Sequence, residues 1–157
     1  RSGERTFQLL NQVAGRAGRS DLQGEVIIQG FNIDHYSLIC AKNHDYLSFY
    51  NEEMKIRKIL KYPPFYNLCL IKIQGLNDKK CEEESNKIIA YLKNNLKEEI
   101  ILGPTPAMIP KVNNIYHYQI IIKYKDTKKI YQYLKFINDK YINSKITVGI
   151  DFNPNKI

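Results

Sequence analysis

The sequence predicts an α+β protein whose second half has the element order β-α-β-β-α-β, that of a ferredoxin-like split βαβ domain. Residues 66–74 alternate apolar and polar side chains, which is typical of a strand with one buried face. Two segments, 79–97 and 127–142, repeat apolar residues at helical spacing. Asn113 and Asn114 separate two strand-like segments, as a tight hairpin turn requires. Two helices over one face of an antiparallel sheet satisfy these patterns.

The other strands of this half follow from the same alternation. Residues 100–103 and 107–112 flank a Gly-Pro-Thr-Pro kink, 115–124 follows the hairpin turn, and 146–151 closes the sheet. Counting alternate residues predicts one buried and one open face. The buried face holds Cys69, Ile71, Ile73, Tyr116, Tyr118, Ile120, Ile122 and Tyr124, and the open face holds Lys72, Gln74, His117, Gln119 and Lys123.

The beginning of the chain is predicted to be mainly helical. Residues 4–17 have helical spacing, and a turn cluster occupies 20–24. The apolar segment 25–29 is predicted to be a short buried strand.

Two further helices are predicted before the chain reaches the sheet. Asp34 can cap a helix that runs to about Asn43, and another helix is predicted over 45–60. Pro63 and Pro64 end that helix because proline has no backbone N–H to donate, so a new unit begins there.

The composition excludes two broad classes of protein. No apolar run approaches the ~18 residues that a membrane span needs, and no signal peptide opens the chain. The three cysteines form no C-x-x-C pair and the three histidines have no metal-ligand spacing. A membrane protein, a secreted disulfide scaffold and a zinc site are therefore not expected.

The formal charge of +8 is distributed unevenly over the 157 residues. Residues 1–60 hold eight basic and seven acidic residues, whereas 61–157 hold sixteen lysines, no arginine and nine acidic residues. The last arginine, Arg57, follows Glu53 by one helical turn, the spacing of an ion pair. Arginine suits bidentate phosphate binding and lysine acts as a mobile point charge, so the two parts indicate different chemistry.

The most informative segment is QVAGRAGR, residues 12–19. On a helix, Gln12, Arg16 and Arg19 project from one side, and Gly15 and Gly18 allow a ligand close to the backbone. The opposite side is apolar, with Phe7, Leu10, Ala14 and Ala17. Two guanidinium groups and an amide on one element suit a polyphosphate. An ordinary solvated helix face would have the same spacing.

The pattern Q-x-x-G-R-x-G-R resembles the sixth conserved motif of superfamily 2 helicases, which closes the ATP site from the second RecA-like lobe. The longer run ERTFQLLNQVAGRAGR, followed by GEVIIQ, resembles the replication-restart helicase family, primosomal protein N′ or replication factor Y. The stretches DYLSFYNEEMKIRKILKYPPF, LGPTPAMIPKV, YHYQIII and IDFNP resemble the C-terminal region of that family in the same order. The resemblance covers nearly the whole chain.

The resemblance implies roles for the residues of this motif. Arg16 and Arg19 would contact the γ-phosphate of ATP as arginine fingers, which assist phosphoryl transfer by stabilising charge. Gln12 would sense the nucleotide, and Gly15 and Gly18 would shape the loop.

The resemblance also implies how the chain is organised. Residues 1–44 would be the remnant of the second helicase lobe, 45–64 a helical connector and 65–157 a DNA-binding domain. The chain has no G-x-x-x-x-G-K-[ST] loop, no acidic metal-binding motif and no initiating Met. We therefore expect an inactive C-terminal fragment of an ATP-dependent 3′-to-5′ DNA helicase that restarts stalled forks. ATP and Mg²⁺ would serve the parent protein, whose Mg²⁺ and zinc ligands lie outside the fragment.

Basic residues of the second half are candidates for contacts with a DNA backbone. They are Lys111, His117, Lys123, Lys125, Lys128, Lys129 and Lys135. The resemblance implies forked and single-stranded DNA, other primosome proteins and the replicative helicase loader as partners, at the nucleoid of a bacterial cytoplasm. It also implies docking of the tail of single-stranded-DNA-binding protein, for which Thr127 and Tyr131 stand where better-known members have Arg and Gln.

Two other interpretations stay open. The chain would be a stand-alone ferredoxin-like module that binds nucleic acid or protein, and its arginine pair would then have no ATPase role. Independently of this choice, a solvated surface of a chain from an AT-rich genome would show the same lysine excess. A regulatory metabolite-binding domain is disfavoured, because the lysine-rich half has no Gly-rich ligand loop.

Overall fold

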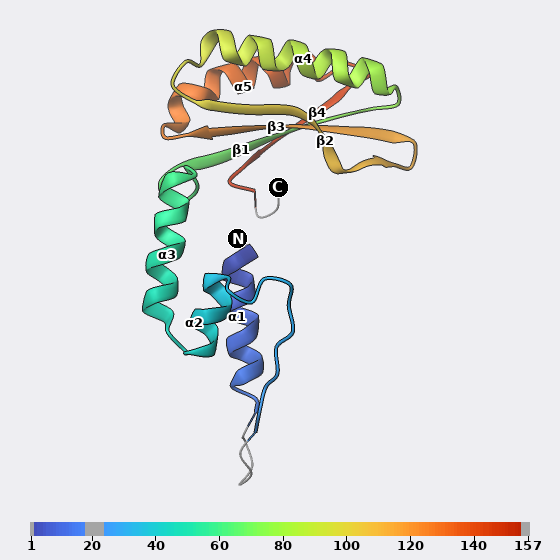
Figure 1. Cartoon of the computed structure of the whole chain (residues 1–157). Helices are drawn as coiled ribbons and strands as arrows, with labels where there is room; N and C mark the ends of the chain where they lie inside the picture. Colours follow the sequence, from blue (N-terminus) through green and yellow to red (C-terminus); the bar gives the residue numbers. More distant parts are fainter. Residues whose placement is uncertain (1, 18–23, 155–157) are drawn as a thin grey trace. The chain divides into compact units, whose positions relative to one another are not determined.

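The structure is a computed structural model that describes residues 2–17 and 24–154. The chain divides between Leu60 and Lys61 into two compact units, called unit 1 and unit 2 below (Figure 1). The change from near-neutral to lysine-rich sequence falls at the same place. No helix in the described ranges is long and apolar enough to cross a membrane. The three-part division implied by the resemblance stays a prediction.

Unit 1 consists of the helices α1 (Ser2–Ala14), α2 (Tyr36–Lys42) and α3 (Tyr46–Ile59). Its buried core is small and comprises Phe7, Cys40, Ala41 and Phe49. The rings of Phe7 and Phe49 stack with their centroids 4.1 Å apart. Helix α3 begins as predicted, because the Asp45 carboxylate accepts a hydrogen bond from the Ser48 N–H at 2.9 Å and caps the helix.

Three predictions for unit 1 are wrong. Helix α1 ends at Ala14, not at residue 17, because glycine at the next position costs about 1 kcal/mol in a helix. Residues 25–29 form no strand, since a strand needs a neighbouring strand to pair with, and the described strands all belong to the sheet of unit 2. His35 caps α2 in place of Asp34, because its Nδ1 accepts a hydrogen bond from the Ser37 N–H.

Unit 2 has the predicted element order. Its elements are β1 (Asn67–Gly75), α4 (Asp78–Asn95), β2 (Ile100–Val112), β3 (Ile115–Tyr124), α5 (Thr127–Tyr141) and β4 (Thr147–Phe152). The four strands pair antiparallel in the order β2-β3-β1-β4, and both helices cover one face of the sheet (Figure 1). This α+β arrangement is compatible with a ferredoxin-like domain. The structure shows no RecA-like lobe in the described part of unit 1.

The hairpin between β2 and β3 turns at Asn113 and Asn114, as predicted. Their φ angles are 49° and 62°, the positive values that a mirror-image two-residue turn requires and that asparagine tolerates. Strand β2 passes through the predicted kink as one strand with two register shifts against β3. Gly103 has a φ of 104°, and a Cβ there would lie 2.8 Å from the carbonyl oxygen of Gln119, so the kink requires glycine.

The core of unit 2 lies between the sheet and the two helices, and it confirms the predicted buried face. The strand residues of this core are Cys69, Ile71, Ile73, Ile120, Ile122 and Tyr124, all at most 2% exposed. Tyr116 and Tyr118 pack against it and are partly buried. The helices contribute Cys81, Ile88, Ile89, Leu92, Ile130, Leu134, Ile137 and Tyr141.

A hydrogen-bonded carboxylate joins the two helices of unit 2. The hydroxyl group of Tyr141 on α5 donates to Glu84 on α4 at 2.6 Å, and Lys87 pairs with the same carboxylate at 2.7 Å. The hydrogen bonds from Lys87 and Tyr141 lower the pKa of Glu84 and outweigh the opposite effect of burial. Burial and the bond to Glu84 raise the pKa of Tyr141. The ionised form of Glu84 is therefore the one that the fold stabilises.

We expect unit 2 to lose stability as the pH falls below about 4.3, the ordinary pKa of glutamate. A carboxylate with a lowered folded-state pKa stabilises above its unfolded-state pKa and loses that effect as the pH falls through the folded-state value. Urea unfolding between pH 3 and 6 should show a weaker pH dependence in Glu84→Gln than in the parent chain. Glu83→Gln, which alters an exposed neighbour, is the matched control. An unchanged pH dependence in Glu84→Gln would contradict the prediction.

Candidate functional site

The predicted arginine motif begins on the last turn of α1 and continues beyond the helix. Gln12 is exposed on the helix, and Gly15 and Arg16 lie in the hydrogen-bonded turn that follows. Arg16 is also exposed. Gly18 and Arg19 lie outside the described residues. The described part of the motif therefore presents one carboxamide and one guanidinium group to solvent.

The two sides of α1 divide as the sequence predicts, up to the end of the helix. Phe7 is buried and Leu10 packs beside it, whereas Gln12 and Arg16 are exposed. Because the helix ends at Ala14, Arg16 lies in the turn that follows, where its N–H donates to the Val13 carbonyl oxygen at 3.1 Å. The expectation of one rigid helix through the whole motif is wrong. Of the two described side chains expected to meet a phosphate, that of Gln12 projects from α1, whereas that of Arg16 is positioned by the turn after the helix.

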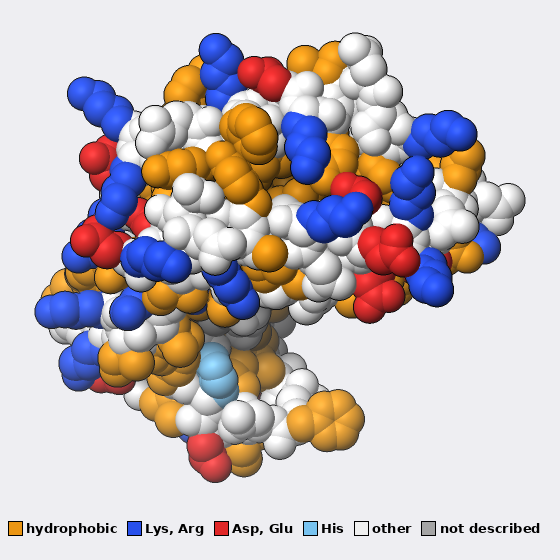
Figure 2. Space-filling view, turned by 90° about the horizontal axis from the view of Figure 1, so that it is seen from above, with side chains coloured by type: hydrophobic (Ala, Val, Ile, Leu, Met, Phe, Trp, Pro, Cys, Tyr) orange, Lys and Arg blue, Asp and Glu red, His pale blue; other side chains and the backbone are white. Residues whose placement is uncertain are grey.

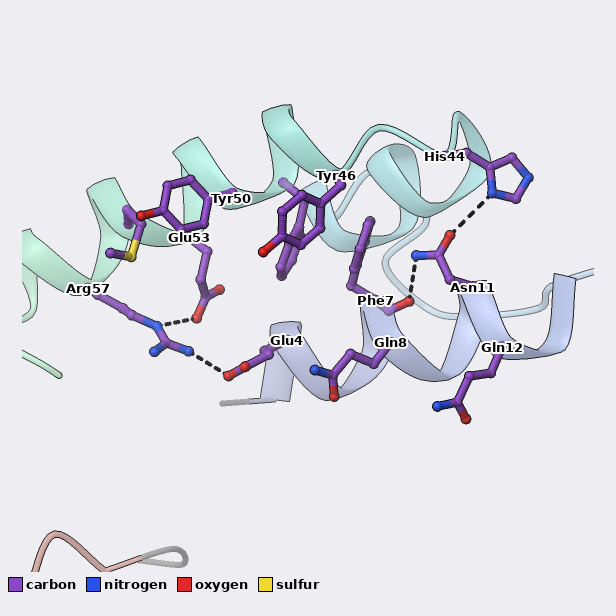
Figure 3. Close-up of a pocket in the computed structure, with 12 residues that line it drawn as sticks. Glu4, Phe7, Gln8, Asn11, Gln12, His44, Tyr46, Tyr50, Glu53 and Arg57 are labelled. Atoms are coloured by element: carbon purple, nitrogen blue, oxygen red, sulfur yellow. Dashed lines mark hydrogen bonds and ion pairs between the residues drawn. The ribbon is translucent and has the colours of Figure 1, made fainter. Parts of the chain in front are cut away.

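A groove of about 690 Å³ lies between α1 and α3 in unit 1 (Figure 3). Gln8 and Gln12 line it from α1, and Tyr46 and Tyr50 line it from α3. His44, just before α3, places its Nδ1 3.2 Å from the side-chain oxygen of Asn11 at the Gln12 end of the groove. No local sequence pattern predicts this groove, because it forms between helices that are distant in the chain.

The opposite end of the groove holds an ion-pair network, called the Arg57 network below. The Arg57 Nη2 donates to Glu4 on α1 at 2.8 Å, and its Nε donates to Glu53 on α3 at 2.7 Å (Figure 3). The Tyr36 hydroxyl on α2 donates to the second oxygen of Glu53. Burial alone would raise the pKa of Glu53, but the hydrogen bonds from Tyr36 and Arg57 outweigh it, so the pKa lies below its ordinary value. The predicted Glu53–Arg57 pair is confirmed.

Two of the predicted DNA-binding residues, His117 and Lys123, lie on β3 opposite the helices. The Nε2 atom of His117 is buried and has no hydrogen-bond partner among the described residues. The sequence predicts an exposed Lys123, and this prediction is wrong. The residue is 7% exposed, and its Nζ lies 3.9 Å from the ring centroid of Tyr62. Burial and the nearby charge of Lys61 lower its pKa. Alternation placed Lys123 on the correct face but could not show that Tyr62 covers it.

Two more of the predicted lysines belong to the β2–β3 hairpin and its end. Lys111 is exposed on β2, with its Nζ 4.8 Å from the ring centroid of Tyr116. Lys125 is exposed directly after β3, with its Nζ 5.1 Å from the centroid of Tyr66. Both ammonium groups stand beside an aromatic ring and remain accessible to an anion.

The last three, Lys128, Lys129 and Lys135, are exposed on α5. Lys129 pairs with Glu98 at 2.5 Å, so part of its charge is already neutralised. Figure 2 shows the face of unit 2 that carries α4 and α5, where lysines stand apart with acidic side chains between several of them. Since His117 lies on the other side of the sheet, the seven predicted residues do not form one patch.

Aromatic side chains also gather on the α4–α5 face, where no sequence pattern predicted a site. Tyr91 stacks on Phe136 with centroids 5.0 Å apart and meets Tyr133 at 6.3 Å. The helical spacing that could have revealed this group was assigned to the core alone. Thr127 and Tyr131, the predicted docking positions, are exposed on the same helix, α5.

The described residues offer no metal site in the form of three or more clustered His, Cys, Asp or Glu side chains. The cysteines Cys40, Cys69 and Cys81 are buried and form no disulfide. Burial raises the pKa of each thiol, that of Cys69 to about 12. These cysteines therefore act as small apolar core residues.

Comparison with known proteins identifies relatives along almost the whole chain. The family described as primosomal protein N C-terminal domain matches residues 58–155. The replication restart protein PriA of Bacillus subtilis is 42% identical over 159 residues, which cover 98% of this chain and 20% of that protein. The proteins of the same name from Synechocystis and Rickettsia typhi are each 36% identical to this chain. Each alignment covers 98% of this chain, and it covers 18% of the Synechocystis protein and 24% of the Rickettsia protein.

The chain thus spans about a fifth of the length of the curated relatives that it matches. Among solved structures, the de novo designed protein Foldit4 matches 58% of this chain and 99% of its own, with 13% identity and a TM-score of 0.46. A likeness at that level indicates nothing about function.

Proposed function

Because the chain belongs to the primosomal protein N C-terminal domain family, we propose that it is the C-terminal part of a bacterial replication-restart protein that acts as an ATP-dependent 3′-to-5′ DNA helicase. The observation that carries this proposal is the extent of the match. The relatives named replication restart protein PriA align with 98% of the chain, so the alignment includes the arginine motif of unit 1 as well as the domain of unit 2.

In this proposal, unit 1 completes the ATP site of the parent protein. Arg16 and Arg19 stabilise the charge that develops on the γ-phosphate, and Gln12 senses whether the nucleotide is present. The exposure of Gln12 and Arg16 supports this role, because both groups are free to meet a site formed by another part of the protein. The chain has no phosphate-binding loop and no acidic metal-binding motif, so ATP, Mg²⁺ and zinc are held by residues elsewhere in the parent protein.

Unit 2 contacts forked and single-stranded DNA through its phosphate backbone. Its sixteen lysines against nine acidic residues give it the charge for this contact. The exposed residues Lys111, Lys125, Lys128 and Lys135 are its main contacts, whereas Lys123 is covered and Lys129 is paired. The tyrosines of β3 face the core, so bases do not stack on the sheet as they do in RNA-recognition domains. The tail of single-stranded-DNA-binding protein, other primosome proteins and the helicase loader are its protein partners.

Binding of the chain to a forked duplex should weaken strongly as salt is added, because each phosphate contact releases a counterion. The double variant Lys128→Ala/Lys135→Ala should bind more weakly and lower the slope of log affinity against log salt by about 2, one for each lysine. Fluorescence anisotropy at four salt concentrations measures both quantities.

Lys42→Ala is the matched control, since it removes one exposed lysine from the end of α2 in unit 1. It should leave the slope unchanged. Affinity that does not depend on salt, or a slope that the double variant leaves unchanged, would overturn the assignment of DNA contacts to these lysines.

A further inference from the structure

We propose that Arg57 is a positioning residue for the arginine motif: by holding Glu4 it fixes α1, the helix that carries Gln12 and leads into Arg16. The proposal rests on the proposed function of that motif. Arg57 lies 41 residues after Arg16 in the chain and on a different helix, so its effect on the motif passes through the Arg57 network.

Helix α1 is held at its beginning by directional contacts. The fork of Arg57 binds Glu4 at 2.8 Å and Glu53 at 2.7 Å, which ties α1 to α3. Gly3 approaches α2 so closely that a Cβ there would lie 2.5 Å from the Tyr36 hydroxyl oxygen. The first turn of α1 therefore contacts both other helices of unit 1.

The apolar contacts of unit 1 do not fix α1 to the same degree. Phe7 of α1 belongs to the buried apolar core, where it stacks on Phe49 at 4.1 Å, and Leu10 packs beside this core and is partly buried. Apolar burial is not directional, so these contacts resist rotation and sliding of the helix less than hydrogen bonds of fixed geometry do. A guanidinium group with two carboxylate partners restricts both movements, because its donors lie in a fixed plane. The side chains of Arg57 and Glu53 are 19% and 12% exposed, so water screens the bond between them less than it screens a surface pair, whereas Glu4 is 41% exposed and its bond to Arg57 is screened more.

The test uses the full-length protein and compares two variants at opposite ends of one contact. Arg57→Ala and Glu4→Ala should each lower kcat for DNA-stimulated ATP hydrolysis about 10-fold and leave KM for ATP within about 2-fold, since a small misplacement of a transition-state contact costs rate more than binding. The double variant should lose no more than Arg57→Ala alone, because Arg57→Ala already removes the contact with Glu4. Arg57→Lys should recover part of kcat, since an ammonium group restores the positive charge but lacks the planar fork that binds two carboxylates.

Lys55→Ala is the matched control, because it removes an ion pair of 2.7 Å with Glu52 on the same helix but makes no contact with Glu4. It should leave kcat unchanged. A further readout is amide hydrogen exchange, which should become faster over residues 8–14 in Arg57→Ala and stay unchanged in Lys55→Ala. This readout reports the hold on α1 directly, without ATP hydrolysis.

Three outcomes would overturn the inference: an unchanged kcat in Arg57→Ala, additive losses in the double variant, or unchanged exchange over residues 8–14. A failure of the proposed function gives a different result. If Arg16→Ala itself leaves ATP hydrolysis unchanged, the motif has no role in hydrolysis, whatever Arg57→Ala does.

Discussion

Replacing Arg16 by alanine in the full-length protein should reduce ATP hydrolysis by about three orders of magnitude and leave the affinity for forked DNA unchanged. An arginine finger stabilises the charge on the transferred phosphoryl group, and its loss costs roughly 10³–10⁵ in kcat. DNA affinity should be retained because Arg16 lies in unit 1, whereas the lysine excess lies in unit 2. Steady-state hydrolysis with saturating forked DNA and a separate binding titration measure the two effects.

The chain offers a matched control for this variant in Arg5, an exposed arginine on α1 outside the motif. Arg5→Ala changes the net charge by the same amount and should leave hydrolysis unchanged. Arg16→Lys should restore little activity, because an ammonium group cannot replace the planar fork of arginine. Equal losses of ATP hydrolysis in Arg5→Ala and Arg16→Ala would show that hydrolysis depends on net charge and not on the position of Arg16. Loss of DNA binding together with hydrolysis in Arg16→Ala would indicate a structural role.

The chain of residues 1–157 alone should not hydrolyse ATP, with or without forked DNA. Its sequence has an anion-stabilising motif but no loop that holds the phosphates of ATP. This outcome separates the proposed function from that of a self-contained ATPase. DNA-stimulated hydrolysis by the purified chain would contradict the proposal.

Local sequence patterns predicted most of unit 2, because each of its strands, helices and turns has the residue pattern typical of that structure within its own segment. The alternation in β1 and β3 set both the strands and their buried face, with Ile71 and Ile122 fully buried as expected. The turn at Asn113 and Asn114 needed only a residue type that tolerates positive φ angles.

Predictions that depend on contacts between residues far apart in the sequence were less accurate. Residues 25–29 have the composition of a strand, but no described strand pairs with them. The exposure of Lys123 depends on Tyr62, which lies on no regular element and has no periodic signal. The Arg57 network shows both cases, because the i,i+4 spacing predicted Glu53, whereas no local pattern points from Arg57 to Glu4.

The charge of the chain is informative only in combination with the structure. Unit 2 carries almost the whole excess of positive charge, but its lysines lie on both sides of the sheet and several stand beside carboxylates. A patch that reads bases would need converging donors, whereas scattered lysines suit contacts along a phosphate backbone. The distribution therefore favours contacts with the charged DNA backbone over recognition of a base sequence.

Leu92→Ala should lower the free energy of unfolding of unit 2 by about 2–5 kcal/mol, the cost of removing a buried leucine and leaving a cavity. Leu92 lies on α4 and is fully buried against the sheet. Leu76→Ala makes the same chemical change at a side chain that is 78% exposed, so it should cost less than about 0.5 kcal/mol. Urea unfolding of the chain, followed by circular dichroism, measures the difference between the two variants.

The same variant tests whether the two units unfold separately. Unit 1 has its own core and its own ion-pair network, so hydrogen exchange over α1 should be unchanged in Leu92→Ala while exchange over α4 becomes faster. Equal costs for Leu92→Ala and Leu76→Ala would show that α4 does not pack on the sheet as described. Faster exchange over α1 to the same degree as over α4 would show that the chain unfolds as one cooperative unit.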